Sequence, residues 1–156
     1  MNLGLVFYNK GEAQNALTHF QLAEAAWQKQ DDILSLARLN TNMGLVFLAL
    51  QQLGPAEEAF NHSIAHYQRL KDDSGALNAT DGLAMALLAQ HRYADAIAKL
   101  RQGLADLHKI AHLPSYAYLL QSMQNHLQQA QRYMRPQQLT AAPYRLAPDK
   151  PMLFHA

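Results

Sequence analysis

The chain has 156 residues, a formal net charge of +1 and no cysteine. This length is typical of one domain, and the small net charge argues against nucleic acid or an anionic membrane as a partner. The absence of cysteine excludes disulfides, thiol catalysis and cysteine-ligated metals. No apolar run approaches the roughly 20 residues of a membrane span, and the first residues lack the pattern of a signal peptide. We therefore expect a cytoplasmic protein.

Alanine, leucine and glutamine dominate the composition, which favours helix over strand. Three segments, which begin at Gly4, Gly44 and Ala84, align without a gap, so the repeat has a constant period of about 40 residues. Six apolar or small columns stay in register, which indicates a true internal repeat. These columns are Leu3, Met43 and Leu83; Phe7, Phe47 and Leu87; Ala16, Ala56 and Ala96; Phe20, Phe60 and Leu100; Ala23, Ser63 and Gly103; Trp27, Tyr67 and Leu107.

Each repeat reads as two helices, because the columns fall at the three- and four-residue spacings of helical stripes. We expect a glycine turn at Asn9-Lys10-Gly11 in the first repeat, and Pro55 near the start of a second helix in the next one. Large columns face small ones, so helix backbones can approach closely. A single pair of helices cannot bury the apolar stripes of both helices, so the pairs must stack. The sequence therefore predicts an all-α, right-handed α-solenoid of antiparallel helix pairs.

The domain boundaries follow from the repeat. The expected first (A) helices span about 1–9, 33–50, 74–90 and 115–134, and the second (B) helices about 12–29, 55–70 and 93–111. The predicted repeat domain is 1–134, with units at about 1–32, 33–73, 74–113 and a partial, capping unit at 114–134.

The two ends differ from a regular repeat. Pro136 falls in the Ala96 column, so the fourth B helix is expected to be missing, with a Pro-rich extended tail at 135–156 that is either disordered or docked in a groove. At the other end Met1 falls inside an expected helix. This predicts part of a longer array, or a homodimer through the exposed N-terminal repeat edge.

The pattern of a large apolar residue, a small residue, an aromatic, a turn glycine, then alanine, an aromatic and a small residue resembles the tetratricopeptide repeat. Leu3-Gly4, Phe7, Gly11, Ala16 and Phe20 carry it in the first unit, and the resemblance covers roughly residues 1–110. The period is about 40 residues rather than the usual 34, similar to repeats in kinesin light chains, G-protein-signalling adaptors and bacterial peptide-sensing regulators.

The resemblance implies a protein–protein interaction module that binds a peptide or partner protein in its concave face. The alternative is the sensor part of a larger bacterial transcription regulator or signalling protein. The face would be lined by A-helix residues outside the packing columns: Asn2, Leu5, Tyr8, Asn9, Arg38, Asn42, Leu45, Asn78, Asp81, Met85, Gln121 and Asn125.

Asn2 and Asn42 share one column of the repeat. An asparagine amide both donates and accepts, so it can hold a peptide backbone, although it can equally bond a neighbouring helix or water. The clamp that holds acidic chaperone tails in this family needs basic residues where this chain has Met1, Asn78 and Gly82. Chaperone binding of that kind is not expected.

Two histidine pairs, His62 with His66 and His108 with His112, have the four-residue spacing that can place two imidazoles on one metal. No Glu completes a metalloprotease motif beside either pair, and acidic ligands are not clustered near them. We expect solvated or packing histidines, no metal and no cofactor.

Paired carboxylates occur at Asp31-Asp32 and at Asp72-Asp73, each where a helix is expected to begin. A capping role that satisfies free backbone N–H groups is favoured over acid–base chemistry. Since the sequence also lacks a phosphate loop, a nucleophile elbow or a Ser/His/Asp spacing, we do not expect an enzyme.

Overall fold

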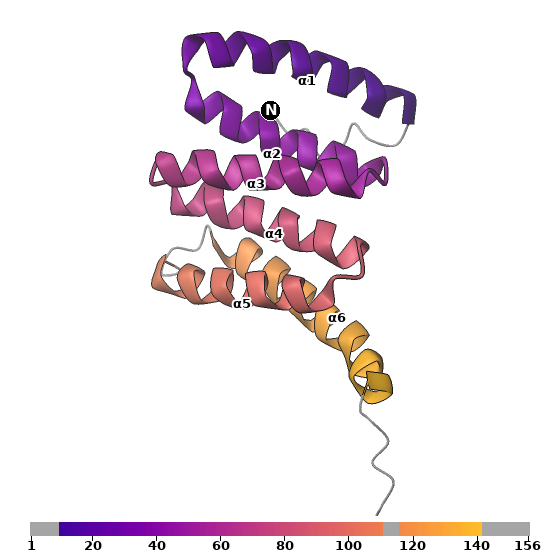
Figure 1. Cartoon of the computed structure of the whole chain (residues 1–156). Coiled ribbons are helices and arrows are strands. Elements are labelled where there is room, and N and C mark those ends of the chain that lie inside the picture. The colour runs from indigo at the N-terminus through magenta and orange to yellow at the C-terminus, as the bar shows by residue number, and fades with distance from the viewer. Residues whose placement is uncertain (1–9, 111–115, 142–156) are drawn as a thin grey trace, which may run out of the picture.

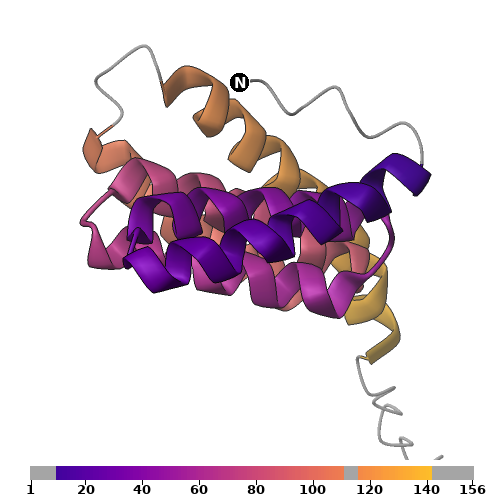
Figure 2. The same cartoon turned by 90° about the horizontal axis from the view of Figure 1, so that it is seen from above.

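The computed structural model describes residues 10–110 and 116–141, which contain six helices and no strand (Figure 1). In chain order they are α1 (Lys10–Gln30), α2 (Ile33–Ala49), α3 (Leu53–Arg69), α4 (Asp73–Ala89), α5 (Tyr93–Ile110) and α6 (Ala117–Ala141). Helices α1 to α5 stack side by side with alternating direction, whereas α6 crosses them obliquely (Figures 1 and 2). The all-α solenoid is confirmed. None of the described helices has the length and apolar character that a membrane span requires.

Two expected boundaries were wrong. Helix α1 begins at Lys10, so Lys10 and Gly11 belong to a helix and not to a turn. Helix α6 continues through Pro136 to Ala141, so 135–141 is helical rather than part of an extended tail. Pro136 removes one backbone donor from this helix, which nevertheless continues through it. The expected A helix at 1–9, the N-terminal edge and the rest of the tail, 142–156, lie outside the described residues.

The four described turns have the same backbone conformation, which the sequence analysis did not predict. Each contains one non-glycine residue with positive φ: Asp31 (52°), Gln51 (58°), Lys71 (56°) and His91 (59°). These positions are evenly spaced along the chain, so each repeat unit consists of two halves of equal length, and each half is a helix followed by a turn. No glycine in the described ranges has positive φ, so Gly11 does not have the expected turn role.

Backbone hydrogen bonds hold each turn in this left-handed conformation. At the end of α3, the Lys71 amide donates to the Gln68 carbonyl at 3.0 Å and the Asp72 amide to the Tyr67 carbonyl at 2.9 Å. This pair of bonds is a Schellman motif, which satisfies the last carbonyls of a helix. Side chains do not make the turn, which explains why Asp, Gln, Lys and His all occur at the left-handed position.

The acidic pairs begin helices, as expected. Asp32 accepts a hydrogen bond from the Ser35 amide at 3.0 Å, and Asp72 accepts one from the Gly75 amide at 2.9 Å. Hydrogen bonding with Ser35 lowers the pKa of Asp32. The other member of each pair has a different position, because Asp31 is the left-handed turn residue and Asp73 opens the first turn of α4. N-terminal capping of α2 and α4 is thus confirmed.

Phe60 of α3 occupies the centre of the core and is fully buried. The edge of its ring at Cδ1, Cε1 and Cζ lies against both Gly44 of α2 and Gly82 of α4, so close that a Cβ at either glycine would collide with it. The buried columns continue into the next unit through Leu83, Ala96 and Leu100. The expected fit of large against small columns is confirmed in these units.

The helices form two layers. Helix α2 contacts α4, and α4 contacts α6, so the three A helices adjoin one another. No comparable contact joins α1 to α3 or α3 to α5 within the described residues. Because the A helices approach each other more closely than the B helices do, the stack curves with α2, α4 and α6 on its inner side.

Replacing Lys71 with glycine should stabilise the protein by about 0.5–1 kcal/mol, because the left-handed conformation strains a residue that has a Cβ. Lys71→Ala is the matched control, since it removes the same charge and keeps the Cβ. Urea unfolding of both variants measures the difference. Equal stability of the two would show that the turn is not strained at this position.

Gly82→Ala should destabilise the protein by about 1–3 kcal/mol, because the new methyl group meets the Phe60 ring in a packed core. Combining it with Phe60→Leu replaces the ring that the new methyl group meets by a smaller side chain. The double variant should therefore lose less stability than the sum of the two single losses, again by urea unfolding. A strictly additive loss would contradict this account of the contact.

Candidate functional site

The inner layer carries most of the side chains that the sequence marked as a binding surface. Arg38 and Leu45 of α2 and Met85 of α4 are exposed, and Asn42 is half-buried. The exposed set continues at Asn78 of α4 and at Gln121 and Asn125 of α6. The remaining residues of the expected N-terminal part of the surface, Asn2, Leu5, Tyr8 and Asn9, lie outside the described residues.

Asp81 has a different environment from the rest of that set. It is only 7 % exposed, because α6 crosses over it. The Ser122 hydroxyl donates to Asp81 Oδ2 at 2.6 Å, and His126 Nδ1 lies 2.7 Å from Asp81 Oδ1. Ser122 and His126 are four residues apart on α6 and therefore face the same way. Both Asp81 oxygens are thus engaged in holding α4 against α6.

The hydrogen bond with Asp81 raises the pKa of His126, against the opposing effect of burial. A protonated His126 donates to the carboxylate and forms a partly buried ion pair, with 20 % and 10 % of the two side chains exposed. The contact is therefore strongest when His126 is charged. It depends on pH in the range where histidine titrates.

Serine, histidine and aspartate also form hydrolytic triads, but the order in which they are hydrogen-bonded here differs. In a triad the serine donates to the histidine, which the carboxylate orients from its other side. Here Ser122 and His126 both bond Asp81, so the imidazole is not placed to accept the serine proton. The arrangement is that of a clamp between two helices.

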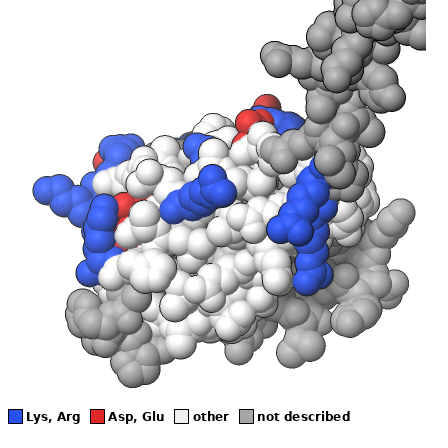
Figure 3. All heavy atoms as spheres, turned by 90° about the horizontal axis from the view of Figure 1, so that it is seen from below, with Lys and Arg blue, Asp and Glu red and all other residues white. Residues whose placement is uncertain are grey.

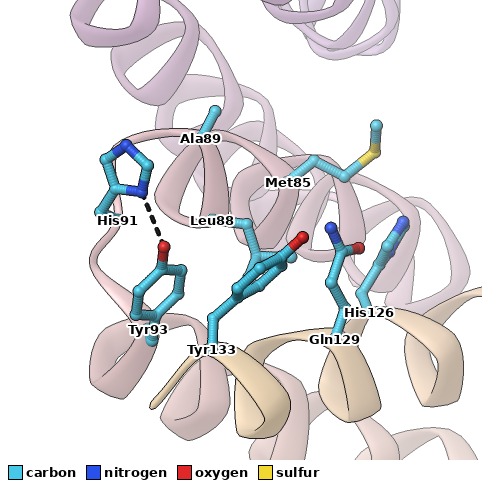
Figure 4. Close-up of a pocket in the computed structure, with 8 residues that line it drawn as sticks. All are labelled: Met85, Leu88, Ala89, His91, Tyr93, His126, Gln129 and Tyr133. Carbon is cyan, nitrogen blue, oxygen red and sulfur yellow. Dashed lines mark hydrogen bonds between the residues drawn. The ribbon is translucent and has the colours of Figure 1, made fainter. Parts of the chain in front are cut away.

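A pocket of about 400 Å³ opens beside this clamp, between α4, the start of α5 and α6 (Figure 4). The Tyr93 and Tyr133 rings form one side of it and are stacked, with centroids 5.5 Å apart and an angle of 22° between planes. The Tyr93 hydroxyl lies 2.7 Å from His91 Nδ1. The lining residues are Met85, Leu88, Ala89, His91, Tyr93, His126, Gln129 and Tyr133.

A second hollow of about 460 Å³ adjoins the pocket along α6 and shares Gln129 and Tyr133 with it. Its other lining residues are Asn125, Gln128 and Arg132. The first hollow is mostly apolar and aromatic, while the second combines amide groups with one guanidinium.

The end of the stack formed by α5 and α6 is a different kind of surface. Seen from that end, it is mostly neutral, with separate basic side chains and few acidic ones (Figure 3). A hollow of about 500 Å³ lies there, lined by Ile97 and Arg101 of α5 and by Met134 and Arg135 of α6, among others.

In the described ranges, no three His, Cys, Asp or Glu side chains come together in a way that could hold a metal ion. His62 is exposed and His66 half-buried on α3. Burial lowers the pKa of His66, and its Nδ1 is buried without a hydrogen-bond partner. His112 of the second pair lies outside the described residues.

Sequence reasoning did not identify His126, Gln129 or Tyr133 as site residues. One signal was present, because Tyr133 stands one repeat period after Tyr93 and so occupies the same column. The spacing of Ser122 and His126 also places two polar groups on one helix face. Neither observation indicates a pocket without knowledge of how α6 crosses α4.

Comparison with known families agrees with this architecture. The family model of the tetratricopeptide repeat matches residues 1–69 and again residues 35–107. The chain belongs to the tetratricopeptide repeat family. Neither the curated proteins nor the solved structures give a match.

Tetratricopeptide repeats are scaffolds that generally mediate protein–protein interactions, and such solenoids present extended concave surfaces. The matched residues end at 107, in α5. Helix α6, which supplies one side of the pocket and the partners of Asp81, therefore lies beyond the matched repeats. The tetratricopeptide part provides α2 and α4 of the inner layer, and α6 completes it.

The clamp should make the stability of the protein depend on pH. Because the pKa of His126 is raised from its ordinary value of 6.5, its contribution is fully present below that value. The contribution is lost as pH rises through the raised pKa. The difference in unfolding free energy between wild type and His126→Gln should therefore shrink from pH 6 to pH 8. Asp81→Asn, which keeps the imidazole, should lose the same pH-dependent part in urea titrations; an unchanged pH dependence in Asp81→Asn would rule the clamp out.

Proposed function

We propose that the inner layer of α2, α4 and α6 binds an extended peptide segment of a partner protein. The observation that carries this proposal is the run of exposed amide and apolar side chains along adjacent A helices. Asn78 of α4 and Gln121 and Asn125 of α6 supply amides, and Leu45 and Met85 supply apolar surface in one repeat column. Such a surface suits a peptide backbone better than a highly charged ligand.

Asn42 contributes a half-buried amide on α2. An amide that already lies in a partly desolvated position can bond a peptide backbone with little further loss of hydration. Asn42 therefore remains the central residue of the proposed contact. Asp81 is excluded from it, because both of its oxygens bond α6.

The proposal can be tested with displayed peptides of about twelve residues, long enough to cross the layer at roughly 3.3 Å per residue. Peptides selected on the full chain should bind Asn42→Ala and Asn78→Ala about fivefold more weakly, as expected for one lost hydrogen bond worth about 1 kcal/mol. Fluorescence polarisation measures the affinity.

The matched control is Asn61→Ala, since Asn61 is an exposed asparagine on the outer helix α3. It should leave the affinity unchanged. Circular dichroism and thermal unfolding confirm that each variant is folded. If Asn61→Ala weakened binding as much as Asn42→Ala, or if neither inner asparagine mattered, the inner layer would not be the binding surface.

A further inference from the structure

The pocket between α4 and α6 has the dimensions and walls of a side-chain receptor. Its volume of about 400 Å³ lies in the range of ligand pockets and exceeds the roughly 150 Å³ of a cavity that holds benzene. Met85, Leu88 and Ala89 form the side that belongs to α4, and the Tyr133 ring projects from α6 opposite them (Figure 4). A large apolar side chain can therefore enter between the two helices.

The aromatic side of the pocket is held in place before any ligand binds. Tyr93 is buried and bonded through its hydroxyl to His91, and Tyr133 stacks on it. Pre-ordered rings lose little conformational entropy on binding. Tyr133 nevertheless remains 54 % exposed and Met85 38 % exposed, so a ligand would bury apolar surface that now faces water. Methionine adapts to the shape of its partner and packs well on aromatic rings.

The charges around the pocket select against a cationic occupant. None of the described residues that line it is a carboxylate, and Asp81, which bonds the lining residue His126, is engaged by Ser122 and His126. His126 itself lines the pocket and is positive when protonated. A lysine or arginine side chain would lose hydration there without gaining a counter-ion, whereas an aromatic or large aliphatic side chain would not.

The adjoining hollow indicates what should lie next to that side chain. It shares Tyr133 and Gln129 with the pocket and is lined by Arg132, which is exposed. A guanidinium pairs with a carboxylate through two parallel hydrogen bonds. The amides of Asn125, Gln128 and Gln129 can bond the peptide backbone between the two sites.

We propose that the pocket between α4 and α6 receives a bulky apolar side chain, preferably aromatic, of a bound peptide, and that Arg132 pairs with an aspartate or glutamate side chain next to it. The inference rests on the proposed function and names the class of partner: a segment with an apolar anchor beside an acidic residue. The surface of tetratricopeptide repeats α2 and α4 alone would lack both features, because α6 supplies Tyr133 and Arg132.

The first test reads the sequences of the displayed peptides. Selection on the full chain should enrich Trp, Phe, Tyr, Leu or Met at one position, with Asp or Glu within two residues of it. The peptides are fused at their C-termini, so a terminal carboxylate cannot supply the charge. Lysine or arginine at the anchor position, or no preferred residue at any position, would overturn the inference while leaving the proposed function intact.

The second test uses matched variants with one enriched peptide. Tyr133→Ala should weaken binding at least tenfold, whereas Tyr118→Ala should not, because Tyr118 lies on the same helix, is 84 % exposed and does not line the pocket. Ala89→Phe adds a ring at the pocket and removes no contact, so it should weaken binding even if Tyr133→Ala disturbs the fold. Equal affinity of wild type and Ala89→Phe would contradict occupation of the pocket.

The proposed pairing of Arg132 with an acidic side chain is also tested with matched variants. Arg132→Gln should reduce the affinity of an acidic peptide about tenfold and remove most of its salt dependence. Arg101→Gln, on the end surface formed by α5 and α6, is the control and should change neither. Loss of affinity in both variants alike would indicate a general charge effect and would refute the specific pairing.

A third test uses a small ligand in place of a peptide, so it examines the pocket even if no displayed peptide binds and the proposed function fails. N-acetyl-tryptophanamide at millimolar concentration should shift the backbone amide signals of Met85, Leu88 and Gln129 in a ¹⁵N correlation spectrum. Tyr133→Ala should abolish these shifts, and N-acetyl-lysinamide should not cause them. The absence of such shifts in wild type would overturn the pocket assignment.

Discussion

The contact of one phenylalanine ring with two glycines sets the spacing of this solenoid. Phe60 projects from the outer helix α3 between α2 and α4 and lies directly on Gly44 and Gly82. Because neither glycine has a side chain, both inner helices come close to the ring and to each other. The close approach of α2 and α4 creates the inner layer, and its exposed residues are therefore presented as one surface. In the next unit Leu100 with Ala84 continues this fit, and Met123 of α6 lies against Gly103.

Helix α6 changes this regular arrangement at the end of the stack. Helices α2 and α4 end at Ala49 and Ala89, and each is followed by a left-handed turn residue, Gln51 or His91. The corresponding position in α6, Gln131, lies inside the helix. By continuing, α6 brings Tyr133 onto Tyr93, which stands at the start of α5. The pocket exists because a helix passes where the earlier units turn.

The polarity of the inner surface depends on which side chains are charged and on which of these are already paired within the protein. Asp81 is buried and bonded by Ser122 and His126 of α6, so the exposed inner surface of α4 consists of amide and apolar groups. Arg38 and Arg132 supply positive charge on two different helices. A surface of this kind holds a peptide through its backbone and through one anchored side chain. Affinity and specificity can thus come from different parts of the same face.

Much of the fold was accessible from the sequence. The six columns at one constant spacing predicted the helix pairs and their packing, since the fit of Phe60 on Gly44 follows from residue size. Asp32 and Asp72 predicted helix starts because capping is a local interaction. Local patterns also placed Arg38, Leu45, Asn78 and Met85 on an open face, where the structure has them exposed.

Other features depended on contacts between residues far apart in the chain. The turns form without a glycine at the left-handed position, because the Schellman hydrogen bonds between backbone groups hold them. Asp81 shares its stripe with Asn78 and Met85, but it is buried because α6 crosses above it. Whether an exposed stripe of one helix stays open depends on the length and crossing direction of another helix. The sequence by itself determined the repeat, the helices and their packing stripes, and only the tertiary structure decided where α6 lies and therefore where the pocket forms.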